Sequence, residues 1–228
     1  MLKDSGTIVK ANKLSKRLST IYDLIDQGSS VADIGSDHGL LVIELFKNKK
    51  CQKLFCNDNK IGPFNILHDH ISKLNTTDIE VSLSNGINKI PNYIDTVVIA
   101  GMGGELIVEI LKKDAYLLKN VKTLILQPNT LSSFVRKEVT EMGYKIIDEK
   151  IIWEKHFYEV IKFGQGYESY NDDDYLFGPI LRKEKSEIFI KMLANKRVKL
   201  EKILQNDLDE RKKCLICEEI ERIKKYEN

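Results

Sequence analysis

The sequence predicts an α/β fold with a doubly wound sheet, because two kinds of segment alternate along the chain. Apolar runs rich in β-branched residues lie at 30–34, 53–57, 79–83, 96–100 and 123–127. Several of these runs are apolar on both faces, which is typical of strands buried in a parallel sheet. Helical patterns separate them, at 40–46, 63–74, 105–111 and 131–142. This alternation favours a parallel sheet with helices on both faces.

The two ends of the chain depart from the alternation. Residues 14–25 predict a short amphipathic helix ahead of the first strand, from the spacing of their apolar positions. Residues 144–154 and 156–164 follow each other with only a short turn between them. They predict an antiparallel hairpin that closes one edge of the sheet and brings it to seven strands.

The composition changes after Gly164, which indicates a second domain. Residues 164–174 read as a polar linker, and from Pro179 onward apolar residues recur at spacings that suit helices packed along a seam. We expect a cofactor-binding domain at 1–165 and a helical, coiled-coil-like domain at 166–228. A turn at 205–209 predicts two antiparallel helices, and one long helix is the alternative.

Composition and charge exclude several classes of protein. The chain has 228 residues, 42% hydrophobic and 31% charged, with a net charge of +2, which excludes a disordered chain. No apolar run reaches the ~18 residues of a membrane span, and no secretion signal is apparent. We expect a soluble, cytoplasmic monomer. Cys214 and Cys217 have the spacing of a metal pair but lack further ligands nearby, so no metal site is expected.

The stretch "VADIGSDHGL" at 31–40 gives the first functional signal. A strand ends near Asp33, and a glycine-containing loop leads into a helix, which is where nucleotides bind in doubly wound sheets. A dinucleotide loop carries glycine where Asp37 stands, and that carboxylate would oppose a diphosphate. S-adenosylmethionine has no phosphate and carries an ammonium and a sulfonium. We therefore predict this cofactor, held in the first loop by Asp33, Gly35, Ser36 and His38, with Asp33 or Asp37 paired to the amino group.

Later strand ends supply further candidates. Asp58 ends the second strand, where a carboxylate can accept both ribose hydroxyls, as it does in NAD enzymes too. Asn85 and Gly86 follow the third strand, where adenine would lie. The fourth strand leads into "GMGG", in which Gly101, Met102 and Gly103 would form a flat wall beside the cofactor and Gly104 would face the substrate. Each residue alone is also an ordinary turn residue.

The amides that follow the fifth strand are candidates for contact with a nucleobase. Gln127 and Asn129 flank Pro128, and amides suit the edge of a base. For Asn129 alone, a strand end followed by a helix cap at Asn129 or Thr130 is an equal alternative. We predict Asp37, Gln127 and Asn129 as the catalytic residues.

Taken together, these motifs resemble one known family. The chain is similar to the bacterial tRNA (adenine-22, N1)-methyltransferases from about Leu14 to Leu204, through "LSKRLSTI", "VADIGSDHG", "ND" with "GPF", "NGI", "IAGMGGELI", "LILQPN" and "FGPILRKEKSEIF". The resemblance implies a class I, Rossmann-like methyltransferase domain with a helical C-terminal domain. It also implies S-adenosylmethionine as cofactor, full-length tRNA as substrate, and Asp33, Gly35 and Asp58 as cofactor residues.

The reaction implied by this resemblance needs a base that has been flipped out of the tRNA. N1 of neutral adenine has a free lone pair, so no general base is required, but the base must be extruded and stacked. Tyr158, Phe157 and Phe64 are candidate stacking partners. Basic segments near both ends predict the tRNA surface, and our RNA-binding candidates are Lys13, Arg17, Gly104, Tyr158, Arg182 and Lys183.

Three alternatives remain open from the residues alone. An NAD-dependent oxidoreductase would use the same sheet and Asp58, although Asp37 and the missing third glycine count against it. A methyltransferase of the same fold could act on ribosomal RNA or on protein. A non-catalytic RNA-binding module would retain the fold without the cofactor.

Overall fold

The protein forms a single seven-stranded sheet, described here by a computed structural model for residues 14–227. The strand order is β3-β2-β1-β4-β5-β7-β6. The strands are β1 (Ser30–Ile34), β2 (Lys53–Asp58), β3 (Ile79–Leu83), β4 (Thr96–Gly103), β5 (Thr123–Thr130), β6 (Tyr144–Glu154) and β7 (His156–Gln165). The first five pair in parallel, and β7 pairs antiparallel with both β5 and β6. The predicted strands and closing hairpin are confirmed.

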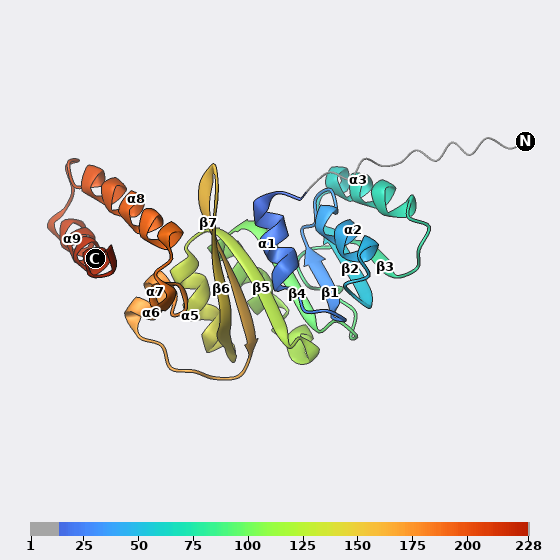
Figure 1. Cartoon of the computed structure of the whole chain (residues 1–228). Helices are drawn as coiled ribbons and strands as arrows, with labels where there is room; N and C mark the ends of the chain where they lie inside the picture. Colours follow the sequence, from blue (N-terminus) through green and yellow to red (C-terminus); the bar gives the residue numbers. More distant parts are fainter. Residues whose placement is uncertain (1–13, 228) are drawn as a thin grey trace, which may run out of the picture.

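Helices cover both faces of this sheet and extend past its β6 edge (Figure 1). They are α1 (Lys16–Leu24), α2 (Leu40–Lys47), α3 (Ile61–Ser72), α4 (Gly104–Lys113), the 3₁₀ helix η1 (Ala115–Asn120), α5 (Ser132–Glu141), α6 (Asp172–Phe177), α7 (Leu181–Glu184), α8 (Glu187–Ile203) and α9 (Glu210–Glu227). Within residues 14–227, no helix combines the length and apolar character that crossing a membrane requires.

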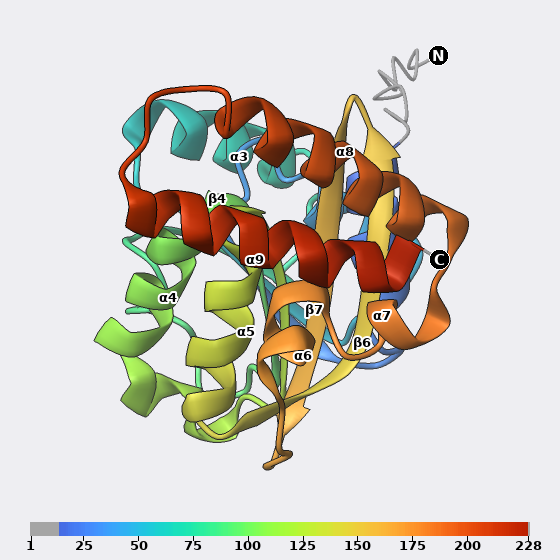
Figure 2. The same cartoon turned by 90° about the vertical axis from the view of Figure 1, so that its left-hand side faces the viewer.

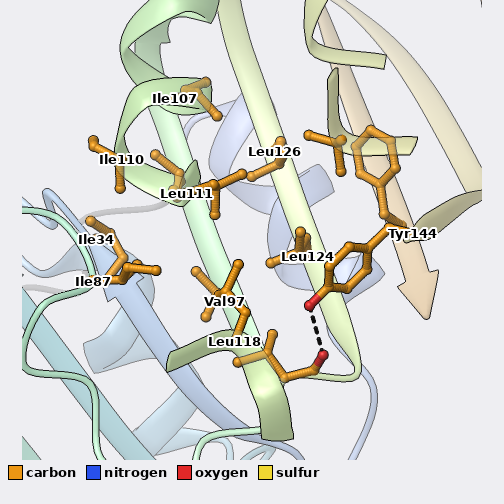
Figure 3. Packing of buried hydrophobic residues seen from close by; sticks show 14 of the residues in the cluster. Ile34, Ile87, Val97, Ile107, Ile110, Leu111, Leu118, Leu124, Leu126 and Tyr144 are labelled. Atoms are coloured by element: carbon orange, nitrogen blue, oxygen red, sulfur yellow. Dashed lines mark hydrogen bonds between the residues drawn. The ribbon is translucent and has the colours of Figure 1, made fainter. Parts of the chain in front are cut away.

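Alternate residues of the central strands build two separate cores. Val31 and Leu54 point to the face covered by α1, α2 and α3, whereas their neighbours Ala32 and Phe55 point to the face covered by α4 and α5. The second core includes Tyr144, whose hydroxyl donates to the Val121 carbonyl oxygen at 2.9 Å (Figure 3). Burial on both faces explains why these strands read as nearly continuous apolar runs.

The C-terminal helices form their own small core beside the sheet. Phe177, Leu181, Phe189, Leu193 and Ile223 are buried together. Helices α8 and α9 lie side by side over the sheet edge (Figure 2), and the chain turns between them at 204–209. The prediction of two helices is therefore confirmed. Because β7 ends at Gln165, we propose the domain boundary directly after that residue.

Two details of this region differ from prediction. The segment predicted as a linker contains the start of α6. The N-cap residue Asn171 accepts from the Asp174 backbone N–H, and the Asp174 carboxylate accepts from the Asn171 N–H. This reciprocal cap stabilises a helix whose first turn is too polar to show apolar periodicity. The long helix also begins at Glu187 rather than at Pro179, with Ser186 as its cap.

A buried ion cluster attaches the C-terminal helices to the sheet. Arg136 on α5 is fully buried and donates from Nε to Glu149 of β6 at 2.7 Å and from Nη2 to Glu159 of β7. Its Nη1 donates to the Tyr175 carbonyl oxygen at 3.2 Å, and Glu149 also accepts from the Ile180 backbone N–H at 3.0 Å. The ion cluster therefore joins the segment that contains α6 and α7 to helix α5 and to strands β6 and β7.

Candidate active site

A pocket of about 690 Å³ opens where the parallel strands end. Its walls come from the loops after β1, β2 and β3, from the end of β4 and helix α4, and from the first turn of α1. This is the crevice at the carboxyl ends of the strands where doubly wound sheets bind their ligands. The fold thus brings together loops that are far apart in the sequence.

Asp33 is the buried charged group of this pocket. It is 6% exposed at the end of β1, and burial raises the pKa of its carboxyl from 3.8 to about 6, while the Ser36 side chain and the charge of Arg17 oppose the rise. The lining of the pocket therefore includes a carboxylate that is poorly solvated when ionised. A positively charged ligand group would favour the ionised form.

Asn57 ties the first loop to the third. This residue of β2 is 1% exposed, and its Nδ2 donates to Ser84 Oγ and to the Gly86 carbonyl oxygen, both at 2.7 Å. The Gly35 backbone N–H donates to Asn57 Oδ1 at 3.3 Å and to the Asn57 carbonyl oxygen at 3.0 Å. One amide thus fixes the spacing between two walls of the pocket. Sequence reasoning missed it, although it directly precedes Asp58 at a strand end.

Gln127 fixes the pocket wall formed by the end of β4 and by Arg17. Its Oε1 accepts from Arg17 Nη1 at 2.8 Å and from the Gly101 N–H at 3.0 Å, and its Nε2 donates to the Pro128 carbonyl oxygen and to Asn129 Oδ1. Asn129 Nδ2 in turn donates to the Gly101 carbonyl oxygen at 2.7 Å. These bonds fix Gly101 at φ +77°, against the Arg17 guanidinium.

This arrangement corrects two predictions. Gln127 is fully buried with both ends of its amide engaged, so it positions Gly101 and Arg17 and cannot meet a base directly. Asn129 and Thr130 do not cap α5, because Leu131 is its N-cap residue and makes no side-chain cap bond. Asn129 is exposed and does not itself line the pocket, but it is bonded to Gly101, which does, and it is the more accessible of the two amides.

The predicted cofactor residues gather at the pocket with one exception. Those that line it are Asp33, Gly35, Ser36, His38, Asp58, Asn85, Gly86, Gly101 and Met102. The exception is Gly103, whose missing side chain faces Thr130. The catalytic candidate Asp37 and the RNA candidate Arg17 also line the pocket. Lining residues that sequence reasoning missed include Ser15, Asn57, Asn59, Lys60, Leu106 and Ile110.

Several RNA-binding candidates lie elsewhere. Gly104 is buried, and a Cβ there would approach the Thr130 carbonyl oxygen to 2.6 Å, so this glycine packs α4 against β5 and does not meet a substrate. Arg182 is bound to Asp174 and to the Tyr226 hydroxyl inside the C-terminal helices, so it is not free to bind RNA as predicted. Lys183 is exposed on α7, and Lys13 lies outside the described residues.

Tyr158 stands behind the pocket wall. Its ring centroid lies 5.8 Å from Arg17 Cζ, a distance that suits a cation–π contact. It does not line the pocket, but it stands against a residue that does. Arg17 therefore links the hairpin β6–β7 to the pocket through Tyr158 on one side and Gln127 on the other.

Comparisons with known proteins identify the family of this chain. Residues 14–161 match the methyltransferase-domain family. The tRNA (adenine(22)-N(1))-methyltransferase of Bacillus subtilis is 35% identical over 188 residues, which cover 78% of this chain and 79% of that protein.

Two solved structures share nearly the whole fold. A Streptococcus pneumoniae protein in complex with S-adenosyl-L-methionine has a TM-score of 0.88 at 30% identity and covers 95% of this chain and 100% of its own. TrmK of M. capricolum, in complex with S-adenosyl-homocysteine, has a TM-score of 0.84 at 32% identity and covers 93% of this chain and 97% of its own. With a matching domain, a relative of this identity and a shared fold, the chain belongs to the tRNA (adenine(22)-N(1))-methyltransferase family.

Proposed function

We propose that this protein transfers a methyl group to N1 of adenine 22 in tRNA, with S-adenosylmethionine as the methyl donor. The single observation that supports this most is the buried carboxylate of Asp33 in a pocket built by four strand ends. A cationic ligand group matches that carboxylate, whereas the diphosphate of NAD would oppose both Asp33 and Asp37. Family membership supplies the substrate, as the Bacillus subtilis relative acts on adenine 22 of tRNA.

The pocket residues divide naturally around such a cofactor. Asp33 would hold the ammonium group, and Asp58 at the end of β2 would accept the ribose hydroxyls. Asn85 and Gly86 would flank the adenine ring, in positions fixed by Asn57. The cofactor supplies an electrophilic methyl group, and the side chains around it supply binding and orientation.

The substrate side needs positioning more than proton transfer. The N1 lone pair of neutral adenine is free, so no residue has to remove a proton before the transfer. The chain must hold the base in line and stabilise the positive charge that arrives on it. Asp37 is exposed at the pocket mouth and can supply a negative field. Asn129 can hydrogen-bond the base edge, and Gln127 holds Gly101 flat beside it.

We propose a monomer that works on tRNA in the cytoplasm. Ribosomal RNA or protein as the substrate is the rival within the same fold.

A transfer assay with radiolabelled S-adenosylmethionine tests the proposed substrate. We expect label in an unmodified tRNA transcript and none in the same transcript with guanine in place of adenine 22. A ribosomal RNA fragment serves as the second control and should stay unlabelled. Label in the ribosomal RNA alone, or equal label in both tRNA transcripts, would contradict the proposal.

Gly35→Ala should weaken cofactor binding without unfolding the protein. Gly35 has φ +74°, and an added Cβ would lie 2.3 Å from Met102 Cε, so the methionine must shift into the pocket. Backbone strain of about 1–2 kcal/mol adds to this, and we expect a Kd roughly tenfold higher by calorimetry. Gly62→Ala is the matched control, because nothing lies within 4 Å of its missing Cβ. Equal affinities for the two variants would show that the loop does not bind the cofactor.

A further inference from the structure

We propose that the tip of the β6–β7 hairpin, residues 151–158, is a stacking platform for an unpaired nucleobase of tRNA other than the methylated adenine. Trp153 is the central residue of this platform. The inference rests on the proposed function, because it names where that RNA meets the chain outside the pocket. It adds a second base-binding site to the one at the cofactor.

The hairpin tip projects beyond the rest of the sheet. Pairing between β5 and β7 extends only from Thr123↔Gly164 to Leu126↔Ile161, whereas β6 and β7 stay paired up to Glu154↔His156. The tip, which does not pair with β5, therefore rises at the carboxyl ends of the parallel strands, next to α1 (Figure 1). The pocket opens at this same end of the strands. RNA bound at the pocket would therefore lie close to the tip.

Aromatic side chains are concentrated on this tip. Trp153 is 49% exposed, and its ring centroid lies 4.6 Å from that of Phe157. On the other strand, His156 and Tyr158 meet edge to face at 6.3 Å. Exposing a tryptophan to water does not stabilise a hairpin end. Any of the nucleobases can stack on such a side chain. Phe157 holds the tryptophan ring in place from one side.

The charges around the tip suit a polyanion. The Glu154 carboxylate is directed at the start of α1, where it accepts from the backbone N–H groups of Lys16 at 3.0 Å and Arg17 at 3.4 Å. The Glu159 carboxylate is held by the buried Arg136. The exposed charged side chains that remain at the tip and the adjoining helix end are the cations Lys155 and Lys16. Phosphates of RNA would meet these lysines, while Glu187, beside Ile188 of the groove wall, pairs with Lys191 at 3.5 Å.

A groove beside Trp153 has the mixed character of a nucleoside site. Its volume is about 490 Å³, and one wall is apolar, formed by Ile151, Ile152, Trp153 and Ile188. The facing wall is the polar side of α1, with Lys16, Ser19 and Thr20. Arg17 and Leu18 of the same helix line the cofactor pocket. Helix α1 is therefore the wall shared by the groove and the pocket.

Helix α8 is a weaker candidate for the RNA-binding surface than its basic sequence predicted. Lys191 pairs with Glu187, Lys196 with Glu219, and Arg197 with both Glu201 and Glu227. These pairs neutralise much of the positive charge of α8. The hairpin tip, whose carboxylates are turned inward, becomes the better RNA surface.

The fluorescence of the protein itself tests this inference, because Trp153 is the single tryptophan of the chain. We expect unmodified tRNA to quench its emission in a saturable manner, as stacking brings a base against the indole. The matched control is Trp153→Phe with Tyr116→Trp. It moves the tryptophan to an exposed position on η1, which precedes β5 and so lies at the amino ends of the parallel strands, away from the hairpin tip. In that variant, the fluorescence should fall only slightly and in proportion to the RNA added, because the RNA absorbs part of the light.

Kinetics provide the second readout. Base stacking contributes enough that Trp153→Ala should raise the KM for tRNA by roughly tenfold, with kcat and cofactor affinity nearly unchanged. Trp153→Phe should restore most of the loss, and Tyr116→Ala should have no effect. Methyl transfer with no saturable quenching, or a KM for Trp153→Ala within about twofold of wild type, would overturn the platform while leaving the proposed function intact.

Two further outcomes would distinguish the stacking platform from the proposed function. Saturable quenching by tRNA without methyl transfer would support the platform and contradict the proposed function. Quenching by an apolar peptide or by self-association, with none by tRNA, would assign the groove to a protein partner and overturn the platform.

Discussion

Asp33→Asn is expected to stabilise the cofactor-free protein at pH 8 and to weaken cofactor binding. Burial raises the pKa of Asp33 from 3.8 to about 6. Because the folded-state pKa exceeds the unfolded one, the stabilising contribution of the protonated carboxyl is fully present below pH 3.8. It is lost as the pH rises through about 6. A pKa difference of about 2 corresponds to roughly 3 kcal/mol, so we expect the variant to melt about 5–10 °C higher at pH 8.

The same substitution should remove the pH dependence of cofactor affinity. In the wild type, a proton competes with the cofactor ammonium for Asp33, so affinity should fall below about pH 6. The variant lacks the charge-assisted bond, which contributes about 1.5–3 kcal/mol, and should bind more than tenfold weaker at pH 8. Its affinity should also vary little with pH. Calorimetry from about pH 5 to about pH 8 measures both the loss of affinity and the loss of its pH dependence.

Asp37→Asn is the control for the stability effect. Asp37 lies in the same loop with a side chain 65% exposed, and its φ of +51° is one that asparagine tolerates. This variant should have the same melting temperature as the wild type at pH 8. If Asp33→Asn also had the wild-type melting temperature, burial would not destabilise the Asp33 carboxylate. The role of Asp33 as the cation-binding group would then lose its physical basis.

Arg136→Met should cause the largest loss of stability. The substitution leaves Glu149 fully buried and Glu159 mostly buried, with no cation between them. Breaking a buried ion pair from one side costs about 3–5 kcal/mol, so the melting temperature should fall by roughly 10 °C or more. Burial already raises the pKa of Glu149 against the effect of Arg136. Without the arginine that pKa should rise further, and the loss should be greatest at alkaline pH.

Arg222→Met provides the comparison. Arg222 on α9 pairs with Asp172 and Asp173 at 3.9 and 3.7 Å, with its side chain 37% exposed. Solvent-exposed pairs of this kind contribute about 0–1 kcal/mol, so this variant should melt close to wild type. Equal destabilisation by the two substitutions would mean that the buried cluster does not attach the C-terminal helices to the sheet.

The sheet was predictable because its strands are buried on both faces. Each strand from 30–34 to 123–127 reads as an apolar run, and the structure places all of them. The strands β4 and β5 nevertheless continue three residues beyond the predicted ends, to Gly103 and Thr130. Glycine and proline argue against a strand on local grounds, but Met102 pairs with Pro128 across irregular registers. Tertiary pairing outweighed the local preference.

The site was predictable where function requires a particular residue at a strand end. Asp33, Asp58 and Gly86 follow from that logic and all line the pocket. Asn57 and Gln127 could not be assigned in the same way, because their roles depend on partners 22 to 110 residues away. The ion pairs of α8 were likewise not predictable, as no local pattern reveals that Lys196 pairs with Glu219 of another helix.

The most direct test of the central claim is to identify the methylated nucleoside and its position. The wild-type protein is incubated with unmodified tRNA and S-adenosylmethionine, and the RNA is digested and analysed by mass spectrometry. The account predicts 1-methyladenosine as the only new nucleoside, located at position 22, as in the Bacillus subtilis relative. A methyl group on another atom of adenine, on another nucleotide, or on no tRNA nucleoside at all would contradict it.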